Sequence, residues 1–182
     1  MTNKICRIIH RFISRKFKVT ILKNYPRYSE KVILKELGKD LVGVEIGVGK
    51  GKHAERMLKK LPIKKLYLVD VDECIEAQGR VYRFNDKIKW IIKKSAYATK
   101  DIPNNLDFVY IDGSHSYKDV KKDLERYYPK LKEGGILCGH DFGQQPVGKA
   151  VWEFSVKINK LFEMREWDWL IRKTSHNPLK WK

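Results

Sequence analysis

The sequence of 182 residues has only three cysteines, Cys6, Cys74 and Cys138, and no apolar run near the roughly 18 residues that a membrane-spanning helix requires. The cysteines form no paired spacing, which excludes a disulfide framework and indicates reduced thiols. The signal-peptide pattern of a basic start, an unbroken apolar centre and a small-residue cleavage site is also missing. We therefore expect a cytoplasmic protein, and the length suits one domain with a full hydrophobic core.

Acidic residues are absent from the first 29 positions, which carry eight Lys or Arg residues. The whole chain has 39 Lys and Arg against 22 Asp and Glu, a formal net charge of +17. This charge favours anionic partners: phosphorylated substrates, nucleic acid or an acidic membrane surface.

Residues 1–18 are expected to form a basic amphipathic helix, because their large apolar side chains fall on one helical face. Three interpretations stay open. The helix docks this face on the domain, or it lies on an anionic membrane, which would also suit a lipid-linked glycan acceptor. An Arg-rich, acid-free amphipathic start can also be a targeting peptide. The apolar residues of this face are Ile5, Ile8, Ile9, Phe12 and Ile13.

Short apolar runs alternate with helical patterns along the rest of the chain, which predicts an α/β fold with a doubly wound, mostly parallel sheet of seven strands. The last strand is expected to be antiparallel, because it follows its neighbour closely in sequence. Strands are predicted at 41–46, 65–69, 88–92, 106–111, 135–139, 161–166 and 169–172. Helices are predicted at 28–37, 52–61, 72–82 and 147–158, with one more between 112 and 135 in which Tyr117, Val120, Leu124, Tyr127 and Leu131 recur at helical spacing.

Residues 106–142 contain two strands that each end in an acidic turn. The first strand runs into Asp112, and the second runs into His140 and Asp141. A strand–helix–strand unit of this length is normally a right-handed crossover, so the two strands should be parallel and end at the same edge of the sheet. Open α/β sheets bind ligands at that edge. Two carboxylates and two histidines, His115 and His140, would converge there as a candidate reaction centre. The alternative is that they are solvated loop ends.

A glycine-rich loop follows the first predicted strand. Its spacing is G-x-G-x-G, from Gly47 to Gly51, and position 52 is Lys. Because this is not the dinucleotide spacing G-x-G-x-x-G, a dehydrogenase is disfavoured. Asp70 ends the next predicted strand, where an acid accepts hydrogen bonds from ribose hydroxyls in nucleotide-binding sheets. The loop and Asp70 therefore predict a nucleotide-like ligand, with a tight turn and a helix-capping acid as the alternative.

Together these motifs resemble the class I S-adenosylmethionine-dependent methyltransferases. The run Glu45-Ile-Gly-Val-Gly-Lys-Gly51 is similar to their first motif, and LYLVDVD is similar to their second. More selectively, IDGSHSYKDVKKDL followed by GGILCGHDF resembles the macrocin-type, family 24 group of small-molecule and sugar O-methyltransferases. VGKAVWEF and WLIRK also look like that group, and the resemblance covers about residues 40–173.

The resemblance implies a role for each matching residue. Asp112 and Asp141 would hold a divalent cation such as Mg²⁺, Asp112 would also contact the cofactor, and His115 would be the catalytic base. The chain departs from many metal-dependent relatives at Phe142, where they have a second oxygen ligand. The implied contacts of the cofactor, S-adenosyl-L-methionine, are Glu45, Gly47, Gly49 and Gly51 around the methionine and ribose, Asp70 on the ribose hydroxyls, and Ser95 and Ala96 beside the adenine.

We therefore expect a basic helical segment at 1–38, an S-adenosylmethionine-binding domain at 39–174 and a basic tail at 175–182. The expected function is O-methylation of a sugar, glycan or other small-molecule hydroxyl. An RNA methyltransferase is the alternative that the charge favours. The chain has His140 and Asp141 where ribose-methylating enzymes of similar size place a lysine. It also lacks the N-P-P-Y type motif after the fourth strand that enzymes methylating the amino groups of bases use. A cofactor-binding module without catalysis is the third alternative.

Overall fold

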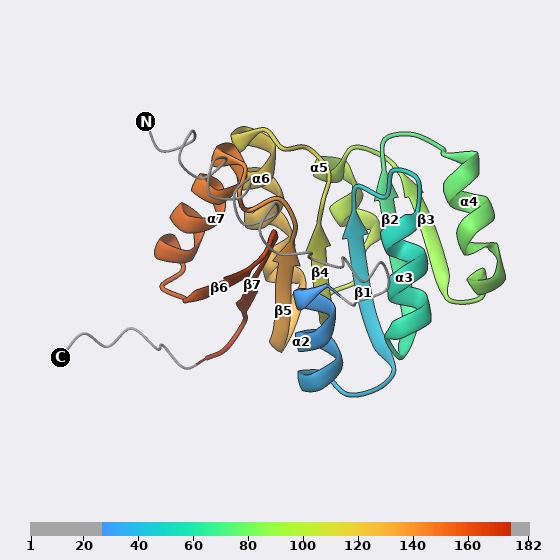
Figure 1. The fold of residues 1–182 in the computed structure, drawn as a ribbon, viewed down its shortest axis with the longest axis horizontal. Helices are drawn as coiled ribbons and strands as arrows, with labels where there is room; N and C mark the ends of the chain where they lie inside the picture. The colour runs from blue at the N-terminus through green and yellow to red at the C-terminus, as the bar shows by residue number, and fades with distance from the viewer. Residues whose placement is uncertain (1–26, 176–182) are drawn as a thin grey trace, which may run out of the picture.

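A computed structural model describes residues 27–175 of the chain, so the predictions for residues 1–18 and for most of the tail lie outside the described residues. One seven-stranded sheet runs through this region in the order β3-β2-β1-β4-β5-β7-β6 (Figure 1). Strands β1 to β5 are parallel, and β7 runs antiparallel to both β5 and β6. The strands are β1 (Leu41–Ile46), β2 (Ile63–Asp70), β3 (Ile88–Ile92), β4 (Leu106–Ile111), β5 (Leu131–Gly139), β6 (Phe162–Arg165) and β7 (Asp168–Arg172).

Helices cover both faces of the sheet, and each face has its own hydrophobic core. On β4, Val109 and Ile111 belong to one core, whereas Phe108 and Tyr110 belong to the other. This alternation follows from the two-residue period of a strand. The first core is covered by α5 (Ser95–Ala98), α6 (Tyr117–Tyr127) and α7 (Gln145–Lys157), and the second by α2 (Tyr28–Glu36), α3 (Lys52–Lys60) and α4 (Ile75–Val81). The predicted doubly wound, mostly parallel sheet with an antiparallel last strand is confirmed.

Most differences from the predicted elements lie at their ends, and one short helix was missed. Leu131, which we placed on the helical face, is the first residue of β5, because α6 gives way to a 3-10 turn (Tyr128–Lys130) that contains Pro129. The predicted helix at 72–82 begins only at Ile75. Helix α5 was missed, because its four residues are too few to show a period.

Helix α2, which belongs to the N-terminal helical segment predicted at 1–38, is tightly joined to the sheet. Ile33 is fully buried, and Ser29 donates hydrogen bonds from its backbone N–H (3.0 Å) and its hydroxyl (2.6 Å) to Oδ2 of Asp168 on β7. Such bonds to a carboxylate are stronger than neutral ones. Helix α2 is thus held firmly against the sheet, and the side chains at its start have fixed positions.

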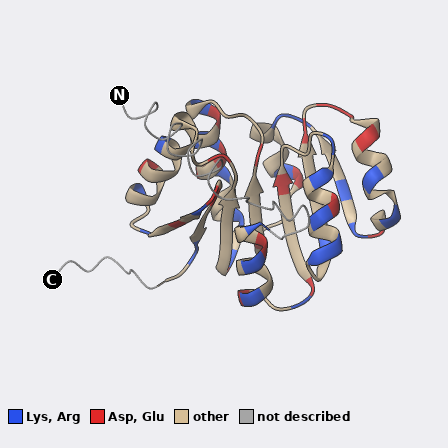
Figure 2. Cartoon of the chain, viewed as in Figure 1, with Lys and Arg blue, Asp and Glu red and all other residues tan. Residues whose placement is uncertain are grey.

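Lys and Arg residues are spread over several elements, α2, α3 and α4 among them (Figure 2). Within residues 27–175, no helix is both long and apolar enough to cross a membrane.

Candidate active site at the carboxyl edge of the sheet

The glycine loop between β1 and α3 has a backbone that favours glycine. Gly47, Gly49 and Gly51 all have positive φ angles, of 86°, 51° and 74°. The carboxylate of Asp70, at the end of β2, accepts hydrogen bonds through Oδ2 from the backbone N–H groups of Val48 (2.8 Å) and Gly49 (2.9 Å). Asp70 therefore organises the loop as well as facing the space beside it.

A cavity of about 730 Å³ lies between this loop and the ends of β2, β3 and β4. Six of the residues predicted to contact the cofactor line it, and they come from four separate parts of the chain. Glu45 and Gly51 are not among the lining residues. The six are Gly47, Gly49, Asp70, Ser95, Ala96 and Asp112.

Helix α6 contributes a carboxylate to this cavity that sequence reasoning missed. Asp123 is buried, and its Oδ1 accepts a hydrogen bond of 2.6 Å from the hydroxyl of Ser95. Burial raises the pKa of Asp123 to about 6, although the bond from Ser95 lowers it. The hydroxyl of Tyr127 donates to the backbone carbonyl of Ser95 at 2.7 Å. Ser95 is thus fixed from two sides. The sequence predicted the helix that carries Asp123, from its helical period, but not the role of this carboxylate.

Asp112, His115 and Asp141 come together at the ends of β4 and β5. Nε2 of His115 lies 3.0 Å from Oδ2 of Asp141 and 3.9 Å from Oδ1 of Asp112. The parallel pairing of the strands places Ile111 beside Gly139, which brings the two acidic turns together. His115 keeps 44% of its side chain exposed, so a substrate could reach it.

The turn that carries His115 is held by the start of α6. Ser116 caps this helix by accepting from the backbone N–H of Asp119. Oδ2 of Asp119 in turn accepts from the hydroxyls of Ser114 (2.9 Å) and Ser116 (2.7 Å). His115 therefore projects from a short turn whose two neighbouring residues are fixed.

His140 is placed differently from His115. Its backbone carbonyl accepts from Nε1 of Trp169 at 3.1 Å, and its Nδ1 lies 3.3 Å from Oδ1 of Asp141. It thus supports Asp141 on the side away from His115.

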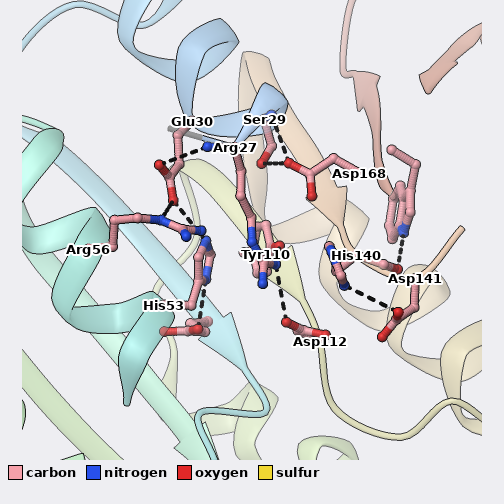
Figure 3. A network of polar contacts seen from close by, with 12 residues as sticks. Arg27, Ser29, Glu30, His53, Arg56, Tyr110, Asp112, His140, Asp141 and Asp168 are labelled. Carbon is pink, nitrogen blue, oxygen red and sulfur yellow. Dashed lines mark hydrogen bonds and ion pairs between the residues drawn. The ribbon is translucent and has the colours of Figure 1, made fainter. Parts of the chain in front are cut away.

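A network of charged side chains under α2 extends to Asp112 (Figure 3). The guanidinium of Arg27 donates to the hydroxyl of Tyr110, and its Nη1 lies 3.4 Å from Oδ2 of Asp112. Sequence reasoning missed Arg27, because its partner Asp112 is 85 residues away and no local period connects them.

The same network contains His53, for which the sequence suggested no partner. His53 is buried between two glutamates, with Nδ1 2.9 Å from Oε1 of Glu45 and Nε2 3.2 Å from Oε1 of Glu30. Burial lowers the pKa of His53, but the two carboxylates raise it more, and the net shift is upward. Glu45 is thus engaged inside the protein, and its predicted contact with the cofactor stays a prediction.

The donor atoms of Asp112, His115 and Asp141 all lie within 4.8 Å of one another, and the two carboxylates are donors of the type that a hard cation such as Mg²⁺ takes. Mg²⁺ usually keeps several waters, so a few protein donors are sufficient. Phe142 adds no donor, since its ring packs at 5.3 Å from the ring of Phe162. Arg27 already contacts one of the donors, Asp112.

A family model described as a methyltransferase domain matches residues 44–142, more than half of the chain. The match begins in β1 and ends one residue after Asp141, so it includes the glycine loop, Asp70 and the three converging side chains.

The curated relatives match only in part. Uncharacterized protein R132 of Acanthamoeba polyphaga mimivirus is 30% identical over 117 residues, which cover 57% of this chain and 52% of that protein. A malonyl-acyl-carrier-protein O-methyltransferase of Calditerrivibrio nitroreducens is 24% identical over 119 residues, covering 65% of this chain and 45% of that protein. The chain spans about half the length of these two relatives.

Solved structures share the fold at low identity. An rRNA methylase from Streptococcus thermophilus has a TM-score of 0.67 at 14% identity, covering 81% of this chain and 95% of that one. A Streptococcus mutans protein in complex with S-adenosylhomocysteine has a TM-score of 0.66 at 16% identity, covering 80% and 95%. At these identities the likeness concerns the fold.

Proposed function

The chain belongs to this methyltransferase-domain family of class I, S-adenosylmethionine-dependent proteins, and we propose that it transfers the methyl group of S-adenosylmethionine to a hydroxyl of a sugar or other small molecule. The observation that carries the proposal is the position of His115. Its Nε2 is 3.0 Å from Asp141, and the turn that bears it adjoins the cavity lined by Asp112 and Gly47. A hydroxyl needs a base to become a good nucleophile, and this histidine is exposed and oriented for that task.

The glycine loop and Asp70 fit the cofactor for a physical reason. A Cβ atom on Gly47 would meet the backbone of Gly113 at 2.3 Å, so only glycine lets the loop approach the end of β4 this closely. Asp70 supplies carboxylate oxygens at the place where the ribose hydroxyls would lie. When bound, S-adenosylmethionine supplies a methyl group on a positively charged sulfur.

His115 and Asp141 would then remove the proton of the acceptor hydroxyl. With Nε2–H of His115 donating to Asp141, the other ring nitrogen, Nδ1, is free to accept the proton of the acceptor hydroxyl. S-adenosylmethionine held beside this base would supply the methyl group to the oxygen and would keep the electron pair of the carbon–sulfur bond, leaving as a neutral thioether. Asp141 stabilises the imidazolium that results, as the carboxylate of a catalytic triad does.

Mg²⁺, if bound, would be held by Asp112 and Asp141, and it would lower the pKa of the acceptor hydroxyl. The sugar or small-molecule acceptor is proposed from the selective motif pair around Asp112 and Asp141, and the O-methyltransferase name of one relative supports only the transfer to oxygen. A panel of sugars, nucleotide sugars and phenols, run beside ribosomal RNA with labelled S-adenosylmethionine, tests it. Labelling of the RNA alone would contradict the small-molecule acceptor.

Substituting Asp70 by alanine is expected to weaken binding of S-adenosylhomocysteine at least ~10-fold, because the ribose hydroxyls and two loop N–H groups would lose a charged acceptor. Titration calorimetry measures this. Asp72→Ala is the matched control, since Asp72 is an exposed acid two residues away that does not line the cavity. Heat with NAD but none with S-adenosylhomocysteine for the unmodified protein would contradict the proposed function.

A further inference from the structure

Arg27 is held in place by a hydrogen bond from its own backbone N–H and by the helix that follows it. Its N–H donates to Oε2 of Glu30 at 3.2 Å, and the other oxygen of Glu30 accepts from Nε of Arg56 at 2.7 Å. The next two residues begin α2, which Ser29 ties to Asp168. Because Glu30, Ser29 and Asp168 are all buried, the position from which the Arg27 side chain extends is fixed by the fold.

The Arg27 side chain is directed into the reaction centre. Its guanidinium reaches the Tyr110 hydroxyl and Oδ2 of Asp112, and only 24% of the side chain is exposed. Tyr110 is fully buried, and its ring lies 4.0 Å from that of His53, so the hydroxyl is a fixed acceptor. Burial raises the pKa of Tyr110 well above its usual value, which keeps the hydroxyl neutral.

The two oxygens of Asp112 thus face different groups. Oδ2 faces Arg27 at 3.4 Å, and Oδ1 faces His115 at 3.9 Å. With His115 neutral, Asp112 and Asp141 carry two negative charges against one on Arg27. A divalent ion held by these carboxylates would therefore share Asp112 with a cation that cannot lose its charge.

We propose that Arg27 is a positioning residue of this centre, which holds Asp112 in place and supplies a fixed positive charge in competition with a divalent ion. The inference rests on the proposed function, because it assigns Asp112 and Asp141 to the reaction centre. The site consequently binds divalent cations weakly, and the net charge beside the acceptor is set by the side chain of the residue that directly precedes α2. An arginine suits this role, because its Nη1 donates to both the hydroxyl and the carboxylate and its positive charge cannot be lost.

The test is a titration with Mn²⁺, whose free form is counted by electron paramagnetic resonance, on the full-length protein without acceptor. The unmodified protein should bind Mn²⁺ with a dissociation constant above about 10⁻⁴ M, the weak end of the range for carboxylate sites. Arg27→Gln should bind it at least ~10-fold more tightly, because like charges a few ångströms apart repel strongly at a half-buried site. Arg27→Lys keeps the charge and should stay close to the unmodified protein.

Two further variants identify the site. Arg56→Gln removes a guanidinium from the same network that pairs with Glu30 but does not contact Asp112, so its Mn²⁺ affinity should not change. Arg27→Gln combined with Asp112→Asn should lose the gained affinity. A merely structural role for Arg27 would predict equal effects of Arg27→Gln and Arg56→Gln.

Equal or weaker Mn²⁺ binding by Arg27→Gln would overturn the inference. If that variant does not fold by circular dichroism, the unmodified protein decides, because a dissociation constant below about 10⁻⁶ M would show that Arg27 does not oppose the ion. Calorimetry with S-adenosylhomocysteine distinguishes a failure of the proposed function from a failure of the role of Arg27. Absence of binding by the unmodified protein contradicts the proposed function, whereas an unchanged Mn²⁺ affinity contradicts only the role of Arg27.

Discussion

Replacing His115 by alanine is expected to lower turnover about 10²- to 10⁴-fold, the usual contribution of a general base, and to leave affinity for S-adenosylhomocysteine unchanged. The reason is geometric. His115 contacts Asp141 at 3.0 Å, and it is absent from the lining of the large cavity that would hold the cofactor. Initial-rate measurements with the acceptor found in the panel, together with calorimetry, give the two quantities.

Because His115 contacts Asp141, the two side chains should affect turnover together. Asp141→Asn should also lower turnover, because the amide cannot stabilise an imidazolium as a carboxylate does. The double variant should be little worse than His115→Ala alone, since residues that act as a unit are not additive. His140→Ala is the matched control, because His140 contacts Asp141 from the other side and should cost less than His115→Ala.

Two results would contradict the proposed role of His115. Turnover of His115→Ala close to that of the unmodified protein would make the histidine a structural residue of the turn before α6. Full additivity of His115→Ala and Asp141→Asn would instead separate the two side chains into independent roles, against the pairing that their 3.0 Å distance indicates.

Much of the fold and part of the site followed from local sequence. The strands at 41–46, 88–92 and 106–111 have the predicted bounds, because their apolar runs are short and are closed by charged or turn residues. The approach of Asp112 to Asp141 needed only one further argument, the parallel crossover between β4 and β5. Local periodicity and handedness together therefore predicted that these two acidic turns would meet at one edge of the sheet.

The buried charges could not be predicted in this way. The contacts of His53 with Glu30 and of Arg27 with Asp112 form only when α2 packs on the sheet, and the contact of His53 with Glu45 forms only when α3 packs on β1. Hydrophobic periodicity locates apolar faces, but it gives no sign of which ionised side chains will meet across the chain. Glu45 shows how a local pattern gives the direction of a side chain but not its partner. Its neighbours Val44 and Ile46 pack in the core under α6 and α7, so Glu45 points to the opposite face.

Gly47 should be the least replaceable residue of the glycine loop. Its φ is +86°, and a Cβ atom would lie 2.3 Å from Cα of Gly113 and 2.5 Å from the carbonyl oxygen of Asp112. Both neighbours are backbone, so neither can rotate away. Left-handed strain and overpacking each cost about 1–3 kcal/mol, so Gly47→Ala should lower the free energy of unfolding by about 2–6 kcal/mol. Denaturant titration measures this loss.

Gly49→Ala is the matched comparison, because it lies in the same loop with a φ of +51° but has no atom within 4 Å of the added Cβ. Only the left-handed backbone is then disfavoured, at about 1–2 kcal/mol. The difference between the variants isolates the contact of the loop with Gly113, which adjoins Asp112. Since that contact sets the distance between the glycine loop and the reaction centre, Gly47→Ala should also bind S-adenosylhomocysteine more weakly than Gly49→Ala. Equal stability and equal affinity of the two variants would show that the close approach of Gly47 to Gly113 does not shape the site.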